Sequence, residues 1–250
     1  MQNNYHYNLE ISDILEKPKN NSSVSTQILF GEKFKILKQH KKFFKIKLIN
    51  DNYSGYLKKQ KFLVNYKPTH KIGKLKSPIF KLSKSRKFTH TKKNLPFASK
   101  IEVLKKFKSF VMFNKNLWIK SKDLKPLNHE IKDFSKIVNL FKNIKYKWGG
   151  RSFKGIDCSA LIQIFYTYNN KFFPRDTIDQ VKFKKGIKLK KKFKKGDVIF
   201  WKGHVGVCLN SKQIIHAYGP RKKVVVMPID YTIKLIAKTA KLEIKKVFSI

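Results

Sequence analysis

The sequence predicts an α+β chain in which two small β-barrels precede a domain that mixes helices with an antiparallel sheet. Three observations support this fold class. A strand-rich segment occurs twice in the first half of the chain, turn residues separate its short apolar runs, and helical spacing appears from about residue 129. The expected domains are residues 1–66, 67–127 and 128–250.

The two predicted barrels rest on an internal repeat. The segment Lys33–Lys38 (KFKILK) returns 67 positions later as Lys100–Lys105 (KIEVLK). Each copy is followed by a closing strand of aromatic and aliphatic residues, Gly55–Leu57 in the first and Leu117–Ile119 in the second. Two units of short strands separated by turns are typical of small β-barrels. The alternative is one larger β-domain in which the similarity is due to chance.

The third predicted domain begins with a helix over residues 131–141, where apolar side chains recur at helical spacing. Eight of the 11 glycines lie between Gly149 and Gly219, where the backbone must turn tightly or approach another group closely. Three of the four Arg residues also lie beyond residue 150, in a chain that otherwise uses Lys. These departures from the Lys background indicate that the functional residues lie in this domain.

The composition is strongly basic, with 58 Lys and Arg against 15 Asp and Glu and a formal charge of +43. Such a charge attracts polyanions in general. Only four of the basic residues are Arg, however, and Arg carries much of phosphate and base recognition. A uniform Lys bias is equally consistent with coding bias, so we expect no nucleic-acid partner.

The remaining totals exclude several classes. Two cysteines without a CxxC pair make neither a disulfide scaffold nor a structural zinc site, and we expect no metal or cofactor. No apolar run approaches the roughly 18 residues that a membrane span requires. The N-terminal residues lack the basic and apolar regions of a secretory signal. We therefore expect a cytoplasmic location.

The first chemical motif is a turn that leads into a helix at Cys158. Asp157 is a good N-cap residue, and the residues that follow supply a helical apolar face. A thiol in the first turn feels the positive end of the helix dipole, which favours the thiolate, although the charge of Asp157 works against it. The alternative is a buried, inert cysteine.

The second motif is a meander of three strands, expected over residues 196–201, 204–209 and 213–218. A hairpin centred near residue 210 places His204 opposite or diagonal to His216, at contact distance on one face. Cys208 lies about 13 Å along the strand from His204, so it is predicted to be a small core residue rather than a partner in the site.

Together these motifs supply a nucleophile at a helix start, a histidine that accepts its proton and a second histidine that orients the first. That is the arrangement of a cysteine acyl-transfer triad. The Asp-Cys-Ser motif at Cys158, the strand that leads to His204, and His216 twelve residues later resemble the NlpC/p60 cysteine peptidases. This resemblance covers roughly residues 129–230 and implies a papain-like catalytic domain.

The resemblance also implies the roles of individual residues. It assigns Cys158 as nucleophile, His204 as general base and His216 as the residue that orients His204. It places Tyr146 where the family has a tyrosine that stabilises the oxyanion or the substrate; the alternative for Tyr146 is core packing.

Four further positions match the substrate pocket of relatives that carry N-terminal bacterial SH3-like domains. Asp176 would accept the free amine of an N-terminal L-Ala, and Asp157, Ser159 and Arg175 would line or brace the site. The alternative is a structural pair of Arg175 and Asp176. The two repeats resemble SH3-like domains themselves, and in such relatives the N-terminal domain walls off one end of the cleft.

The implied function is hydrolysis of γ-D-glutamyl-diamino acid bonds in murein stem peptides or peptidoglycan fragments. Two other classes are weighed against it. One is a binding protein for cell wall or polyanion that carries an inactive peptidase-like domain, and the other is an acyltransferase of the same fold. The presence of all three candidate catalytic residues argues against the former, and the absence of an amphipathic anchor argues against the latter.

Overall fold

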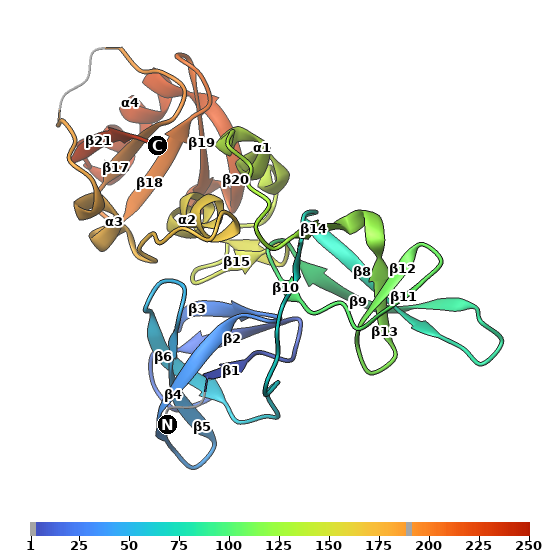
Figure 1. Ribbon diagram of the computed structural model, residues 1–250. Helices are drawn as coiled ribbons and strands as arrows, with labels where there is room; N and C mark the ends of the chain where they lie inside the picture. The colour runs from blue at the N-terminus through green and yellow to red at the C-terminus, as the bar shows by residue number, and fades with distance from the viewer. Residues whose placement is uncertain (1–3, 189–191) are drawn as a thin grey trace. The chain divides into compact units, whose positions relative to one another are not determined.

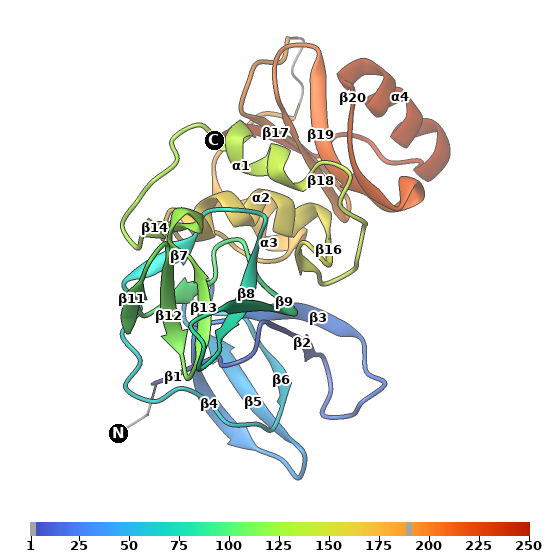
Figure 2. The same cartoon turned by 90° about the vertical axis from the view of Figure 1, so that its right-hand side faces the viewer.

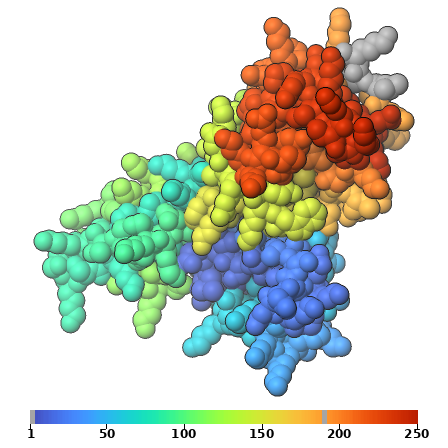
Figure 3. All heavy atoms as spheres, turned by 180° about the vertical axis from the view of Figure 1, so that it is seen from behind, coloured from blue at the N-terminus to red at the C-terminus, as the bar shows by residue number. Residues whose placement is uncertain are grey.

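The structure is a computed structural model that describes residues 4–188 and 192–250, and it divides into two compact units, Met1–Glu130 and Ile131–Ile250 (Figure 1). Figure 3 shows their heavy atoms, in blue to green for the first unit and yellow-green to red for the second. Both predicted barrels lie within the first unit, and their separation into two domains near residue 67 stays a prediction.

The first unit begins with a six-stranded antiparallel sheet in the order β1-β4-β5-β6-β2-β3. Its strands are β1 (Asn4–His6), β2 (Ile11–Leu15), β3 (Val24–Leu29), β4 (Lys33–Gln39), β5 (Phe43–Leu48) and β6 (Ser54–Lys58). Apolar side chains at alternating strand positions pack into one core that includes Tyr7, Ile28, Phe34 and Ile46. The closing strand β6 falls where the repeat predicted a strand.

Two further sheets complete the first unit, in the orders β10-β7-β14 and β11-β12-β13-β8-β9. Their strands are β7 (His70–Ile72), β8 (Lys76–Leu82), β9 (Phe88–Pro96), β10 (Lys100–Ile101), β11 (Lys105–Phe107), β12 (Phe110–Asn114), β13 (Leu117–Lys120) and β14 (Leu124–Pro126), with the 3-10 helix η1 (Ser121–Asp123) before β14. Phe30, which follows β3, packs in their core edge-on to Phe113, with ring centroids 5.2 Å apart.

The repeated segment does not fold the same way twice. Its first copy is the continuous strand β4, whereas its second copy is split between β10 and β11, which lie in different sheets. At the break, two side chains from the segment between β6 and β7 bind the backbone. The hydroxyl of Tyr66 accepts from the amide of Glu102 at 2.8 Å, and that of Thr69 accepts from the amide of Val103 at 3.3 Å. These bonds replace ladder partners.

The second unit is built on a five-stranded antiparallel sheet in the order β20-β19-β18-β17-β21. The strands of the unit are β15 (Arg151–Ser152), β16 (Gly155–Ile156), β17 (Asp197–Trp201), β18 (His204–Cys208), β19 (Gln213–Tyr218), β20 (Lys223–Pro228) and β21 (Lys246–Ser249). Its helices are α1 (Phe134–Val138), α2 (Cys158–Tyr168), α3 (Thr177–Phe183) and α4 (Ile229–Ala240), with the 3-10 helices η2 (Asn139–Phe141) and η3 (Gly219–Arg221).

The helices α2 and α4 flank this sheet (Figure 2). Helix α2 packs on β18 and β19, and all of its residues are buried. Helix α4 packs on β19 and β20 and contributes Ile236 to a core cluster with Trp201 and Cys208. Cys208 thus lies in the core, as the sequence predicted, with Ile214 as its cross-strand neighbour.

The predicted helix over residues 131–141 is wrong in its first part. Helix α1 begins only at Phe134, and the final turn is the 3-10 helix η2. Asp133 sets the start, because its carboxylate accepts from the amide of Ser135 at 3.0 Å as an N-cap. Ile131 lies before the helix, and its backbone amide donates to the side chain of Asn169 at 2.9 Å.

Candidate active site

Helix α2 places the candidate nucleophile at its first residue. The carboxylate of Asp157 caps the helix by accepting from the amide of Ala160 at 2.8 Å, as expected for an N-cap. The Cys158 side chain is buried, and its sulfur lies 4.0 Å from the carbonyl oxygen of Gly203. The backbone amides of Val205 and Ser159 hydrogen-bond to the same sulfur. The thiol therefore lies beside the turn at which β18 begins.

The resting state of this cysteine is the thiol. Burial raises the pKa of Cys158 to about 12, and the charge of Asp157 adds to the increase. The amides of Val205 and Ser159 and the charge of Arg175 act in the opposite direction and lower the pKa, but less. The expected opposition between the helix end and Asp157 is present, and burial, which acts in the same direction as Asp157, outweighs the groups that lower the pKa. A base must therefore remove the proton as the sulfur attacks.

The two candidate histidines lie together on adjacent strands. In the β18–β19 ladder Val207 pairs with Ile215 and Cys208 with Ile214, so His204 lies diagonal to His216, one of the two predicted placements. The ring nitrogen Nε2 of His204 is 2.9 Å from Nδ1 of His216. His216 is fully buried, whereas His204 is half-buried. The second histidine therefore holds the first from the interior.

A buried thioether defines which nitrogens carry protons, and sequence reasoning missed it. The Nε2 of His216 lies 3.3 Å from Sδ of Met227 on β20. A thioether accepts hydrogen bonds and cannot donate them, so we infer that His216 is protonated at Nε2. Its Nδ1 then accepts from Nε2–H of His204, which leaves Nδ1 of His204 unprotonated and able to act as a base. Only the pairing of β19 with β20 brings Met227 to this position.

Both imidazoles are neutral near pH 7. Burial lowers the pKa of His204 to about 4, from an ordinary value of 6.5. Burial also lowers the pKa of His216 to about 3, and the neighbouring His204 contributes to that decrease. A neutral pair is what a general base requires before it takes up the thiol proton.

Three of the predicted binding residues form a buried network under the start of α2. The guanidinium of Arg175 binds the carboxylate of Asp157 through two nitrogens, at 2.6 and 3.1 Å, and donates to the hydroxyl of Ser159 at 2.7 Å. The amide of Gly149 donates to the same carboxylate at 3.0 Å. Because Asp157, Ser159 and Arg175 are all buried, their geometry is that of a brace that positions Cys158.

Gln180 on α3 extends the brace. Its side-chain amide nitrogen donates to the carbonyl oxygens of Ser159 at 3.0 Å and Pro174 at 2.8 Å, and the residue is fully buried. These bonds tie α3 to the first turn of α2. Asp176, the residue before α3, is half-buried, and its backbone oxygen accepts from the amide of Gln180 at 2.9 Å.

A pocket of about 350 Å³ opens beside His204 and is also lined by Tyr146. The ring of Tyr146 lies next to Gly219, where an added Cβ would be 3.8 Å from its Cζ. Burial raises the pKa of Tyr146, and the neighbouring Cys158 and Asp157 raise it further. The side chain is therefore a phenol, which can donate a hydrogen bond near the thiol.

Comparison with known proteins finds matches to two parts of the chain. Residues 143–238 match the model of the NlpC/P60 family, and residues 14–62 match that of the bacterial dipeptidyl-peptidase SH3 domain. The chain therefore contains an NlpC/P60 domain and a bacterial SH3 domain. The second β module, beyond residue 66, has no counterpart in these matches.

Individual relatives are similar to this chain over different lengths. The chain is 25% identical over 237 residues to the γ-D-glutamyl-L-lysine dipeptidyl-peptidase of Bacillus subtilis, which covers 84% of this chain and 77% of that protein. It is 31% identical over 85 residues to the murein DD-endopeptidase/LD-carboxypeptidase MepS of Escherichia coli, over 31% of this chain and 44% of that protein. An NlpC/P60 family structure from Bacillus cereus superposes with a TM-score of 0.76 at 16% identity, over 91% and 94% of the two chains.

These matches support a peptidase domain of the NlpC/P60 type in residues 143–238. Within residues 4–188 and 192–250, no cluster of His, Cys, Asp or Glu side chains is arranged to hold a metal ion. No helix in the same part of the chain has the length and apolar character to span a membrane.

Proposed function

We propose that this protein is a cysteine peptidase that cleaves the γ-D-glutamyl-diamino acid bond in murein stem peptides, with Cys158, His204 and His216 as its triad. The observation that carries the proposal is the hydrogen bond of 2.9 Å between His204 and His216 beside the start of α2. It holds the imidazole of His204, whose chain neighbours Gly203 and Val205 contact the Cys158 sulfur at the N-terminus of α2.

The reaction follows from the proton positions. Nδ1 of His204 takes the proton from the Cys158 thiol as the sulfur attacks the γ-carbonyl carbon, and the carbonyl oxygen becomes an oxyanion. The phenol of Tyr146 donates a hydrogen bond to that oxygen. His204 then gives its proton to the leaving amine, and the C–N bond breaks to leave a thioester. His204 next removes a proton from water, which attacks the thioester and releases the acid and the thiol.

The substrate end is assigned by the resemblance and belongs to this proposal. Asp176 accepts the free amine of the N-terminal L-Ala, while the buried Arg175, Asp157 and Ser159 hold the helix and the Asp176 loop in place. The β module beyond residue 66 acts as a second SH3-like domain. We also propose a cytoplasmic role in recycling imported wall peptides, where the thiol stays reduced. Fractionation of cells that express the native protein tests the location.

Incubation of the purified protein with L-Ala-γ-D-Glu-diaminopimelate tests the activity. We expect L-Ala-γ-D-Glu and free diaminopimelate as products. Cys158→Ala should abolish the reaction, whereas Cys208→Ala, which alters the other buried cysteine, should retain it after correction for folded protein. Absence of cleavage by the wild type, or cleavage by Cys158→Ala, contradicts the proposal.

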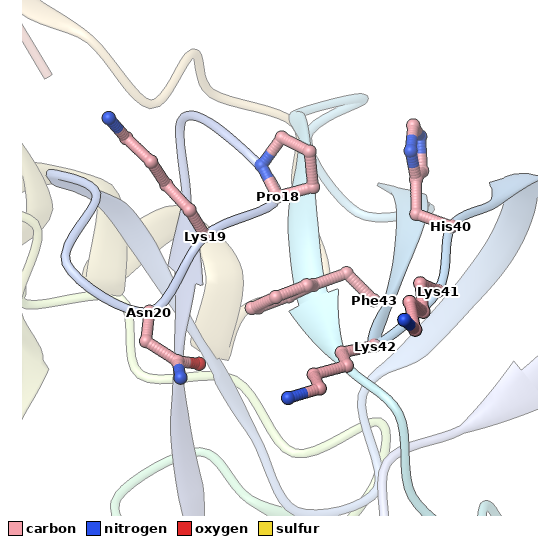
Figure 4. Close-up of a pocket in the computed structure, with 7 residues that line it drawn as sticks. All are labelled: Pro18, Lys19, Asn20, His40, Lys41, Lys42 and Phe43. Carbon is pink, nitrogen blue, oxygen red and sulfur yellow. The ribbon is translucent and has the colours of Figure 1, made fainter.

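A second candidate function is binding of an anionic wall polymer by the first β module. A cavity of about 370 Å³ lies between the loop after β2 and the β4–β5 hairpin (Figure 4). Three lysines, Lys19, Lys41 and Lys42, line it around Pro18 and Phe43, and no Asp or Glu is among its lining residues. Salt-sensitive binding of a teichoic-type polymer that Lys41→Glu/Lys42→Glu abolishes would support this function; binding unchanged by the double substitution would exclude this cavity.

A further inference from the structure

The pocket beside His204 has a wall that the catalytic residues do not account for. Helix α4 and the residues just after it contribute Ile236, Thr239, Ala240 and Leu242, and Pro220 of η3 closes another side. This wall is largely apolar. The pocket has a volume of about 350 Å³, which is large enough for an amino-acid side chain. Neither α4 nor this pocket was predicted from the sequence.

The position of the pocket indicates which part of a substrate it receives. His204 lines it directly, and in the proposed reaction His204 protonates the leaving amine. The group attached to that amine must therefore lie on the His204 side of the scissile bond. Gly203, whose carbonyl oxygen is 4.0 Å from the Cys158 sulfur, lines the same pocket. The pocket thus extends from His204 and Gly203, beside the Cys158 sulfur, to α4.

The charge in the pocket is asymmetric. Among the described residues that line it, Lys202 is the only Lys, Arg, Asp or Glu. Lys202 and Gly203 form the two-residue turn between β17 and β18, since Trp201 pairs with His204 across it. Gly203 has a φ of +74°, a conformation that glycine adopts without strain. The turn therefore holds the lysine at the mouth of an apolar pocket, next to His204.

We propose that this pocket is the leaving-residue subsite, and that it selects a residue whose aliphatic side ends in a carboxylate, which Lys202 binds. The inference rests on the proposed peptidase function. Diaminopimelate is lysine with a carboxylate added at its ε-carbon, so the two residues differ in the group that Lys202 would recognise. A leaving lysine would bring the same ammonium group towards Lys202 without a carboxylate to offset the repulsion between like charges. The preference would differ from the one in the name of the Bacillus subtilis relative.

Four peptides test the subsite: L-Ala-γ-D-Glu-X, with X as diaminopimelate or lysine, each with its α-carboxyl free or amidated. We expect the wild type to cleave the diaminopimelate peptides with a kcat/KM about fivefold above that of the lysine peptides. If the amidated peptides keep the preference for diaminopimelate, Lys202 binds the side-chain carboxylate. If amidation lowers kcat/KM for the diaminopimelate and the lysine peptide alike, Lys202 binds the α-carboxylate instead.

Charge reversal supplies the control. Lys202→Glu should reverse the preference, whereas Lys212→Glu, which removes the same charge at the exposed turn between β18 and β19, should leave it within about twofold. Equal cleavage of all four peptides, or equal effects of the two substitutions, overturns the subsite while the peptidase function stands. If the wild type cleaves none of the peptides, the peptidase function itself fails and the subsite falls with it.

Discussion

At the scale of single residues, the triad depends on the proton on Nε2 of His216, which takes no part in the proposed transfer. The thioether of Met227 accepts from Nε2 of His216, and that bond sets the tautomer of both imidazoles. The side chain of Tyr218 stacks on His216 with an interplanar angle of 18° and limits its rotation. A general base with the wrong tautomer is ineffective, so Met227 acts as a positioning residue through two hydrogen bonds.

Replacement of that acceptor tests the tautomer. Met227→Leu keeps the volume but removes the acceptor, which allows Nδ1–H on His216 and Nδ1–H on His204, the form that cannot take the thiol proton. We expect kcat to fall about tenfold, less than when a substitution enforces the wrong tautomer. Nitrogen chemical shifts of the imidazoles should report the change in a Cys158→Ala background. Met112→Leu is the control; unchanged shifts and unchanged kcat in Met227→Leu would refute the role.

The buried histidine also makes stability depend on pH. The pKa of His216 is about 3 in the folded protein and near 6.5 when unfolded, so the unfolded chain binds more protons between these values. The contribution is complete above pH 6.5 and is lost as the pH falls towards 3. From pH 7.5 to pH 4.5 the free energy of unfolding should fall by about 2 kcal/mol more in the wild type than in His216→Asn. Urea titrations measure this difference.

Exposed His90→Asn provides the matched substitution in the same titrations. Its free energy of unfolding should follow that of the wild type over the same range. If His216→Asn also follows the wild type, the buried imidazole does not contribute to the pH dependence.

At the scale of elements, helix α2 is held by an ion pair at its N-terminus rather than by packing alone. Arg175 and Asp157 have side-chain exposures of 1% and 9%, and their shortest N–O distance is 2.6 Å. Removal of one partner leaves the other as an uncompensated buried charge. The pair also binds two other groups at the helix start: the amide of Gly149 donates to Asp157, and Arg175 donates to the hydroxyl of Ser159. Loss of the pair therefore affects both stability and the placement of Cys158.

One arginine substitution and one lysine substitution compare how much a buried and an exposed ion pair contribute to stability. Arg175→Met should lower the free energy of unfolding by about 3 kcal/mol. Lys195→Met removes the partner of Asp133 in an exposed pair, in which the side chain of Lys195 is 51% exposed and that of Asp133 is 35% exposed. This substitution should change the free energy of unfolding by less than about 1 kcal/mol. Denaturant titration compares the two. Equal losses would mean that the buried pair contributes no more than a surface one.

At the scale of the whole molecule, the net charge of +43 is a property of the chain rather than of the site. Near the triad the charges of Asp157 and Arg175 oppose one another, and the pocket next to His204 carries one lysine. The positive field acts at longer range, where it attracts peptides that carry several carboxylates.

Salt should therefore slow the association of the enzyme with its substrate and leave the rate of the chemical step unchanged. When ionic strength rises from about 0.02 M to about 0.5 M, we expect kcat/KM for the murein peptide to fall about tenfold. The value of kcat should stay within about twofold, because the reacting groups are buried. A salt-dependent kcat would place screened charges in the chemical step, and a constant kcat/KM would remove the steering role.

The sequence alone was sufficient for the local parts of this protein. Strands β17, β18 and β19, the cap at Asp157 and the proximity of His204 and His216 follow from neighbouring residues and one turn, whereas the strand register decided between an opposite and a diagonal placement. The repeat was less informative, because its second copy is split between β10 and β11, where Tyr66 and Thr69 bind the backbone. Short-range spacing predicts elements well when their hydrogen bonds are local.

Tertiary structure alone decided what lies behind and beside the triad. The tautomer depends on Met227, which reaches His216 only through the pairing of β19 with β20. The brace depends on Arg175, which lies 18 positions from Asp157, and the pocket depends on α4. Burial is likewise a tertiary property, and it raises the pKa of Cys158 where the helix dipole alone would lower it. Contacts between distant segments create each of these features, so local sequence pattern does not reveal them.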